Sequence, residues 1–157
     1  MTKKQIQEFT RRITHANRSG LTLIKFEMLF VYFDDIVRAC QENDRQAMTD
    51  GVHHADAVLK SFQETLDFQY EISAQLYALY DFHRRQLSKV IIKNSAEGLD
   101  QSREMLLKTY HAFQEAAKQD TSGPLMRNAQ QVYAGYTYGK HDLNESYDLH
   151  SSRGFLA

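Results

Sequence analysis

Residues 21–42 read LTLIKFEMLFVYFDDIVRACQE, and this stretch decides the fold. It contains no glycine and no proline, so nothing in it interrupts a helix. Apolar side chains recur at spacings of three and four residues, which predicts a helix with one stripe facing a core. The members of that stripe are Leu23, Phe26, Phe30, Phe33, Val37 and Cys40.

Three further segments with the same period follow along the chain. Their apolar stripes run from Met48 to Leu66, from Ile72 to Ile91 and from Leu99 to Ala117. Asn43 with Gln46 and Asn94 with Glu97 fit capping boxes that open the second and fourth segments. The remaining turn is expected near Asp67. Four segments of roughly 20 to 24 residues with short connections predict an all-α, antiparallel, up-down four-helix bundle.

The segments outside the bundle divide the chain further. Residues 1–20 carry Ile6, Phe9 and Ile13 at helical spacing and are expected to form an N-terminal strap. Residues 21–120 form the bundle. Residues 121–157 are expected to hold a short fifth helix that starts at Gly123–Pro124, followed by a mobile tail rich in tyrosine and glycine. A length of 157 residues fits one domain of this kind.

Charge and composition exclude several classes of function. Nineteen basic against twenty acidic side chains give a formal charge of −1, which argues against a nucleic-acid or anionic-membrane surface. One cysteine excludes an internal disulfide framework and a cysteine-rich zinc site. The first residues contain no apolar run typical of a secretory signal. The longest apolar run, residues 28–33, is too short to cross a bilayer. We therefore expect a cytoplasmic protein without membrane insertion.

The residues also give no catalytic or metal-binding pattern. A di-iron site in a helical bundle needs paired Glu-x-x-His motifs, and this chain contains none. Asp50 and His53 give the nearest spacing, and the histidines are scattered over several segments. Cys40 lies on the core stripe, and no phosphate loop or nucleophile elbow occurs. The sequence therefore predicts no enzyme, no cofactor and no metal.

The first long helix nevertheless has more apolar surface than a bundle helix needs. Residues 28–33 cover more than one helical turn with apolar side chains, whereas a bundle helix normally exposes one polar face to solvent. Ile24, Met28, Val31 and Tyr32 lie off the core stripe and need another cover. The strap, a second copy of the chain and a client peptide are three candidate covers, and the sequence pattern leaves the choice open.

The order of three motifs resembles a known family. Residues 20–24 (GLTLI) lead into the aromatic helix, residues 42–44 (END) form the first connection, and residues 79–87 (LYDFHRRQL) run on to Ile-Lys-Asn at 92–94. These motifs are similar to those of the bacterial flagellar secretion chaperone FliS. The likeness covers about residues 15–118 in consistent order.

The resemblance implies a helical bundle that binds the disordered C-terminal segment of flagellin along apolar interhelical grooves. Binding would prevent premature polymerisation before the flagellar export apparatus takes over the client. The implied client-binding residues are Leu21, Leu23, Ile24, Met28, Val31, Tyr32, Tyr80, His83, Arg84 and Leu87. We expect the strap residues Ile6, Phe9 and Ile13 to cap part of the groove when no client is bound.

Two alternatives remain beside this interpretation. One is a homodimeric helical-bundle interaction protein without a flagellin client, and the other is a bundle metal protein. Tyr80, Asp81 and Arg85 are also open to two interpretations, because Asp81 and Arg85 at a spacing of four fit an intrahelical ion pair as well as a client contact.

Overall fold

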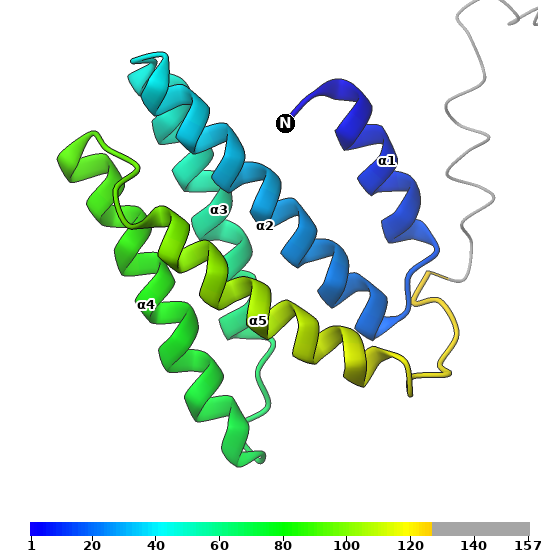
Figure 1. Cartoon of the computed structure of the whole chain (residues 1–157). Helices are drawn as coiled ribbons and strands as arrows, with labels where there is room; N and C mark the ends of the chain where they lie inside the picture. Colours follow the sequence, from blue (N-terminus) through cyan, green and yellow to red (C-terminus); the bar gives the residue numbers. More distant parts are fainter. Residues whose placement is uncertain (127–157) are drawn as a thin grey trace, which may run out of the picture. The chain divides into compact units, whose positions relative to one another are not determined.

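The computed structural model describes residues 1–126, which form helices and no strand (Figure 1). Within these residues the helices are α1 (Lys3–Thr14), α2 (Arg18–Gln41), α3 (Arg45–Glu64), α4 (Glu71–Lys93) and α5 (Leu99–Ala117). The predicted all-α fold is confirmed, and the turn expected near Asp67 lies between α3 and α4.

Helices α2 to α5 form a closed up-down bundle. Helix α2 packs on α3 and α5, α3 packs on α4, and α4 packs on α5, so each helix contacts its neighbours in sequence and α5 returns to α2. Helix α1 stands apart from this ring and lies along α2 (Figure 1). The strap is therefore a helix, and its packing partner is the helix with the surplus apolar surface.

One continuous core fills the bundle. Its buried members are Phe26, Leu29, Phe33, Ile36, Ala39, Met48, Val52, Ala55, Leu59, Phe62, Tyr80, Leu87, Val90, Leu99 and Leu106. At Gly51 α3 comes close to α2, because a Cβ atom there would lie 2.8 Å from Cγ1 of Ile36. This contact explains a glycine inside a helix, where it otherwise weakens helix formation.

Both predicted capping boxes are wrong. Asn43 has φ 54° and belongs to the turn, while Asp44 is the N-cap of α3 and accepts a hydrogen bond from the Ala47 amide at 2.9 Å. Asn94, with φ 50°, ends α4, and α5 starts only after Gly98. Asparagine tolerates the left-handed conformation better than most residues, so it ends a helix as readily as it begins one.

The predicted division into strap, bundle and tail stays a prediction. Residues 124–126 are not helical, and the rest of the expected fifth helix and the tail fall in 127–157, outside the described residues. Among the described helices, none is long and apolar enough to cross a membrane.

Candidate functional site

A second apolar cluster lies between α1 and α2, separate from the bundle core. Phe9, Ala16 and Ile24 are its buried members, and Met1, Ile13, Leu21, Met28 and Val31 pack against them. None of these residues belongs to the bundle core. We call this group the strap cluster. Helix α2 thus has two apolar faces, one that holds the bundle together and one that, within residues 1–126, is covered by α1 with Met1 and Ala16 beside it.

The strap docks through part of its predicted stripe. Phe9 and Ile13 are four residues apart, so they lie on one face of α1, and both pack into the strap cluster. Ile6, one turn earlier, is 51% exposed. Thr2 and Gln5 form a capping box at the start of α1. The helix is therefore well formed, and its apolar contact with α2 comes from a few side chains.

One polar bridge also fixes α1 to the bundle. The Arg12 guanidinium binds the Glu27 carboxylate of α2 with two hydrogen bonds, the longer of which is 2.9 Å. The Tyr110 hydroxyl of α5 donates to the same carboxylate at 3.3 Å. Burial, with a smaller contribution from the Glu27 charge, raises the pKa of Tyr110. Glu27 therefore connects the strap with two helices of the bundle.

The short connection between α1 and α2 is clasped by the chain that follows α5. The Asn17 side chain donates to the Ser122 carbonyl at 3.2 Å, and the Leu125 amide donates to the Ala16 carbonyl at 3.0 Å. The Ser19 hydroxyl binds the Asp120 carboxylate. Hydrogen bonds from the two serine residues of this clasp lower the pKa of Asp120. These contacts fix the connection between α1 and α2, which we call the hinge of the strap.

The strap leaves a hollow at each of its ends. Near its C-terminus a space of about 550 Å³ is lined by Leu23, Ile24 and Pro124, among others. Near its N-terminus a space of about 370 Å³ is lined by Met1, Ile6, Tyr32 and His54, among others. Open space therefore borders α1 at both of its ends.

Tyr32 does not belong to the strap cluster, although the sequence grouped it with Ile24, Met28 and Val31. Its ring packs against the bundle core and stacks on the His54 ring of α3, with 5.2 Å between ring centroids. Burial, and to a lesser degree the Asp35 charge, raises the pKa of Tyr32. Its exposed edge lines the hollow at the N-terminal end of α1.

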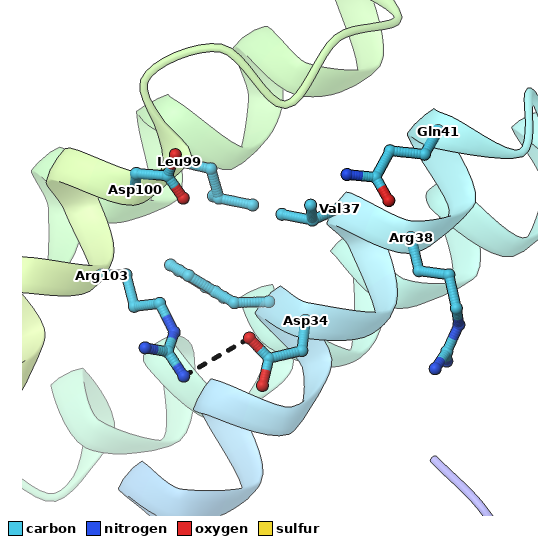
Figure 2. A pocket seen from close by; sticks show the side chains of 8 residues that line it. Asp34, Val37, Arg38, Gln41, Leu99, Asp100 and Arg103 are labelled. Carbon is cyan, nitrogen blue, oxygen red and sulfur yellow. Dashed lines mark ion pairs between the residues drawn. The ribbon is translucent and has the colours of Figure 1, made fainter.

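Another side of α2 carries a shallow groove against α5 that the sequence did not predict (Figure 2). Its volume is about 320 Å³, and Phe33, Val37 and Leu99 form its apolar lining. Figure 2 shows Arg103 reaching toward Asp34 across the groove, with 3.4 Å between their charged atoms. The two residues are far apart in sequence, so no local pattern pairs them.

Three of the α4 residues proposed as client contacts are instead part of the bundle interior. Tyr80, His83 and Leu87 are buried, so they offer no surface to a client in this conformation. Tyr80 stacks on Phe62 at 5.2 Å, and the His83 ring binds the Ser102 hydroxyl. Burial lowers the pKa of His83 to about 4 and raises the pKa of Tyr80.

Arg84 joins α4 to α3. Its guanidinium Nε lies 2.7 Å from the Asp56 carboxylate, and Nη1 donates to the Gln63 amide oxygen at 3.0 Å. Arg85 pairs with Asp81 at 2.8 Å within α4, which matches the intrahelical ion pair expected from their spacing. The geometry of both arginines is that of structural contacts.

No three His, Cys, Asp or Glu side chains gather as candidate metal ligands within residues 1–126. What the described residues do provide is a helical bundle in which a second apolar face of α2, separate from the bundle core, packs against α1. The architecture is that of an all-helical bundle with one further helix packed along its outside.

A family model described as flagellar protein FliS matches residues 1–120, and the chain belongs to that family. The family consists of chaperones of flagellar assembly. A comparison with curated proteins finds no match to this chain.

Proposed function

We propose that this chain is a cytoplasmic export chaperone that binds the disordered C-terminal segment of flagellin on the face of α2 now covered by α1. The observation that carries the proposal is the separation of the strap cluster from the bundle core. Because α1 adds nothing to that core, it can leave without unfolding the bundle. The face that it exposes is continuous with the hollows at its two ends.

The energetics favour such an exchange. A disordered segment loses conformational entropy when it folds on a surface, so its affinity has to come from wide apolar burial. Ile24, Met28 and Val31 supply that surface, and Leu21 and Leu23 extend it toward the start of α2. While no client is present, Phe9 and Ile13 keep the same surface out of water. We leave Tyr80, His83 and Leu87 out of the proposed surface, because they are buried.

Release to the export apparatus then needs no chemical step. The client and α1 compete for one face, so the chain returns to its closed form as the client is handed on. Binding before export keeps the client segment away from other flagellin molecules, which prevents premature polymerisation.

A titration with a synthetic peptide of the flagellin C-terminal segment tests this proposal. Light scattering with and without peptide gives the stoichiometry, and a one-to-one complex is expected. A homodimer that does not respond to the peptide would support the alternative in which a second copy covers α2.

A pair of matched variants locates the binding face. Met28→Glu places a charge in the strap cluster, whereas Leu107→Glu makes the same kind of change on an exposed part of α5. We expect Met28→Glu to weaken peptide binding at least about tenfold while the bundle core remains folded, and Leu107→Glu to have little effect. Equal affinities of the two variants would place the client elsewhere.

A further inference from the structure

The turn between α3 and α4 and the first two turns of α4 expose an unusual group of large apolar side chains. Phe68 is 63%, Tyr70 66%, Ile72 55% and Tyr77 46% exposed. Single exposed apolar residues are common, but a group of them at one place marks an interaction surface. We call these residues the corner patch. It lies on the far side of the bundle from α1, at the lower end of α4 in Figure 1.

The corner patch is held in a defined shape. The Asp67 carboxylate accepts a hydrogen bond from the Gln69 amide at 2.9 Å, and the Asp67 carbonyl accepts one from the Ser73 hydroxyl at 2.6 Å. The rings of Phe68 and Tyr77 contact each other, with 6.0 Å between centroids. The backbone of the turn and the paired rings of Phe68 and Tyr77 are therefore held in place, which lowers the entropic cost of binding.

The residue at the start of α4 is not the one that helix stability favours. Tyr70 stands at the N-cap and makes no side-chain capping hydrogen bond, whereas serine, aspartate and asparagine are preferred there. Its ring is also largely outside the core. A residue that breaks a local rule without a compensating contact in the fold indicates selection for another role.

The charges around the corner patch define the kind of partner. No lysine or arginine occurs from residue 61 to residue 83. Asp67 and Glu71 flank Phe68 and Tyr70, and neither carboxylate forms an ion pair within residues 1–126. Exposed aromatic rings also attract cations through their faces. Carboxylates and rings together favour a partner that carries lysine or arginine beside apolar side chains.

We infer that the corner patch docks a basic, amphipathic helical segment of a partner protein, independently of the client face on α2. The apolar side of that segment covers Phe68, Tyr70 and Tyr77, and its cationic side pairs with Asp67 and Glu71. This inference goes beyond the proposed function, because the two surfaces lie on different helices and neither needs the other.

Fluorescence anisotropy with a labelled amphipathic helical peptide of lysine, leucine and alanine tests this inference on the full chain. A peptide with glutamate in place of lysine is the charge control. We expect the basic peptide to bind, the acidic peptide not to bind, and added salt to weaken the basic complex.

Three double variants, one of them a control, separate the contributions. Asp67→Asn with Glu71→Gln removes both charges but keeps the hydrogen-bonding atoms, and Asp100→Asn with Glu104→Gln makes the same change on exposed positions of α5. Phe68→Ser with Tyr70→Ser removes the rings and gives α4 a capping residue. We expect the first and third pairs to weaken binding at least about tenfold and the α5 pair to have little effect. Because serine caps a helix better than tyrosine, the melting temperature of the third pair should not fall.

Three results would overturn the inference. In the first, Met28→Glu abolishes peptide binding, which would place the peptide on the face of α2. In the second, the α5 pair weakens binding as much as the Asp67 and Glu71 pair. In the third, the peptide does not bind while Phe68→Ser with Tyr70→Ser converts a dimer to a monomer, which would make a second copy of this chain the partner.

Discussion

Asn17 donates its side-chain amide to the main-chain carbonyl of Ser122, 3.2 Å away, across 105 positions of the sequence. The same side chain accepts a hydrogen bond from the Gly20 amide at 2.8 Å and so caps α2. One residue therefore starts the longest described helix and fastens the segment after α5 to the hinge of the strap. Its two roles use different atoms, so substitutions can separate them.

Asn17→Asp keeps the capping oxygen and removes the donor to Ser122. We expect the capped start of α2 to persist and the Leu125 amide, which donates to the Ala16 carbonyl, to exchange its hydrogen faster. Asn17→Ala removes both roles and should cost about 1 to 2 kcal/mol of unfolding free energy. Denaturant unfolding and hydrogen exchange measure the two effects. Indistinguishable stabilities of Asn17→Ala and the parent chain would show that the cap contributes nothing.

Phe9→Ala should loosen the strap without unfolding the bundle. The ring is buried in the strap cluster and belongs to no part of the bundle core, so its loss weakens the docking of α1 by about 3 to 5 kcal/mol. Hydrogen exchange should accelerate in α1 and stay slow in α3. Ile6→Ala is the control, because Ile6 is half-exposed and its substitution removes little buried surface. If Phe9→Ala lowered the stability of α3 as well, the strap would be part of the bundle core.

His83 should make the bundle less stable in acid. Burial holds its pKa at about 4 in the folded chain, against 6.5 for the ordinary side chain, so the unfolded chain takes up a proton first as the pH falls. Above pH 6.5 this histidine leaves the free energy of unfolding independent of pH. As the pH falls from 6.5 to about 4 the free energy of unfolding decreases, and the total loss is about 3 kcal/mol. Urea unfolding at several pH values measures it.

His83→Gln provides the comparison for this effect, since glutamine is polar and does not titrate in this range. The carboxylates titrate in both chains, so the difference between the two pH profiles isolates the histidine. Parallel profiles between pH 7 and pH 4 would contradict a buried neutral imidazole.

Arg84→Ala should reduce stability and leave client affinity unchanged. Its guanidinium joins α4 to α3 through Asp56 and the buried amide of Gln63, and its removal leaves that amide oxygen without its partner. We expect a loss of about 1 to 2 kcal/mol of unfolding free energy. Arg85→Ala breaks only an exposed pair within one helix and should cost less than about 0.5 kcal/mol. Thermal melts and peptide titration of both variants check this. If Arg84→Ala lost affinity for the peptide while its melting temperature stayed unchanged, Arg84 would be a client contact.

The sequence predicted the two faces of α2 better than the residues that meet it from elsewhere. Ile24 and Phe26 are two positions apart, so a helical period places them on different faces, and the structure puts one in the strap cluster and the other in the core. The same period placed Phe9 and Ile13 on one side of the strap. These relations are local and depend only on helix geometry.

The incorrect predictions concern residues whose role depends on distant contacts. Likeness to a family motif does not show which way a side chain points: it implied client contacts for Tyr80 and His83, and both side chains are buried. The pairing of Asp34 with Arg103 joins α2 to α5 and has no signal within either helix. The clasp of Asn17 and Ser122 was hidden for the same reason.

Hydrogen exchange of the full chain, alone and saturated with the flagellin C-terminal peptide, tests the central claim most directly. If the client replaces α1 on α2, the amides of Lys3–Thr14 should lose protection on binding while those of Arg18–Gln41 keep or gain it. A bound complex in which α1 stays as protected as in the free chain would contradict the claim.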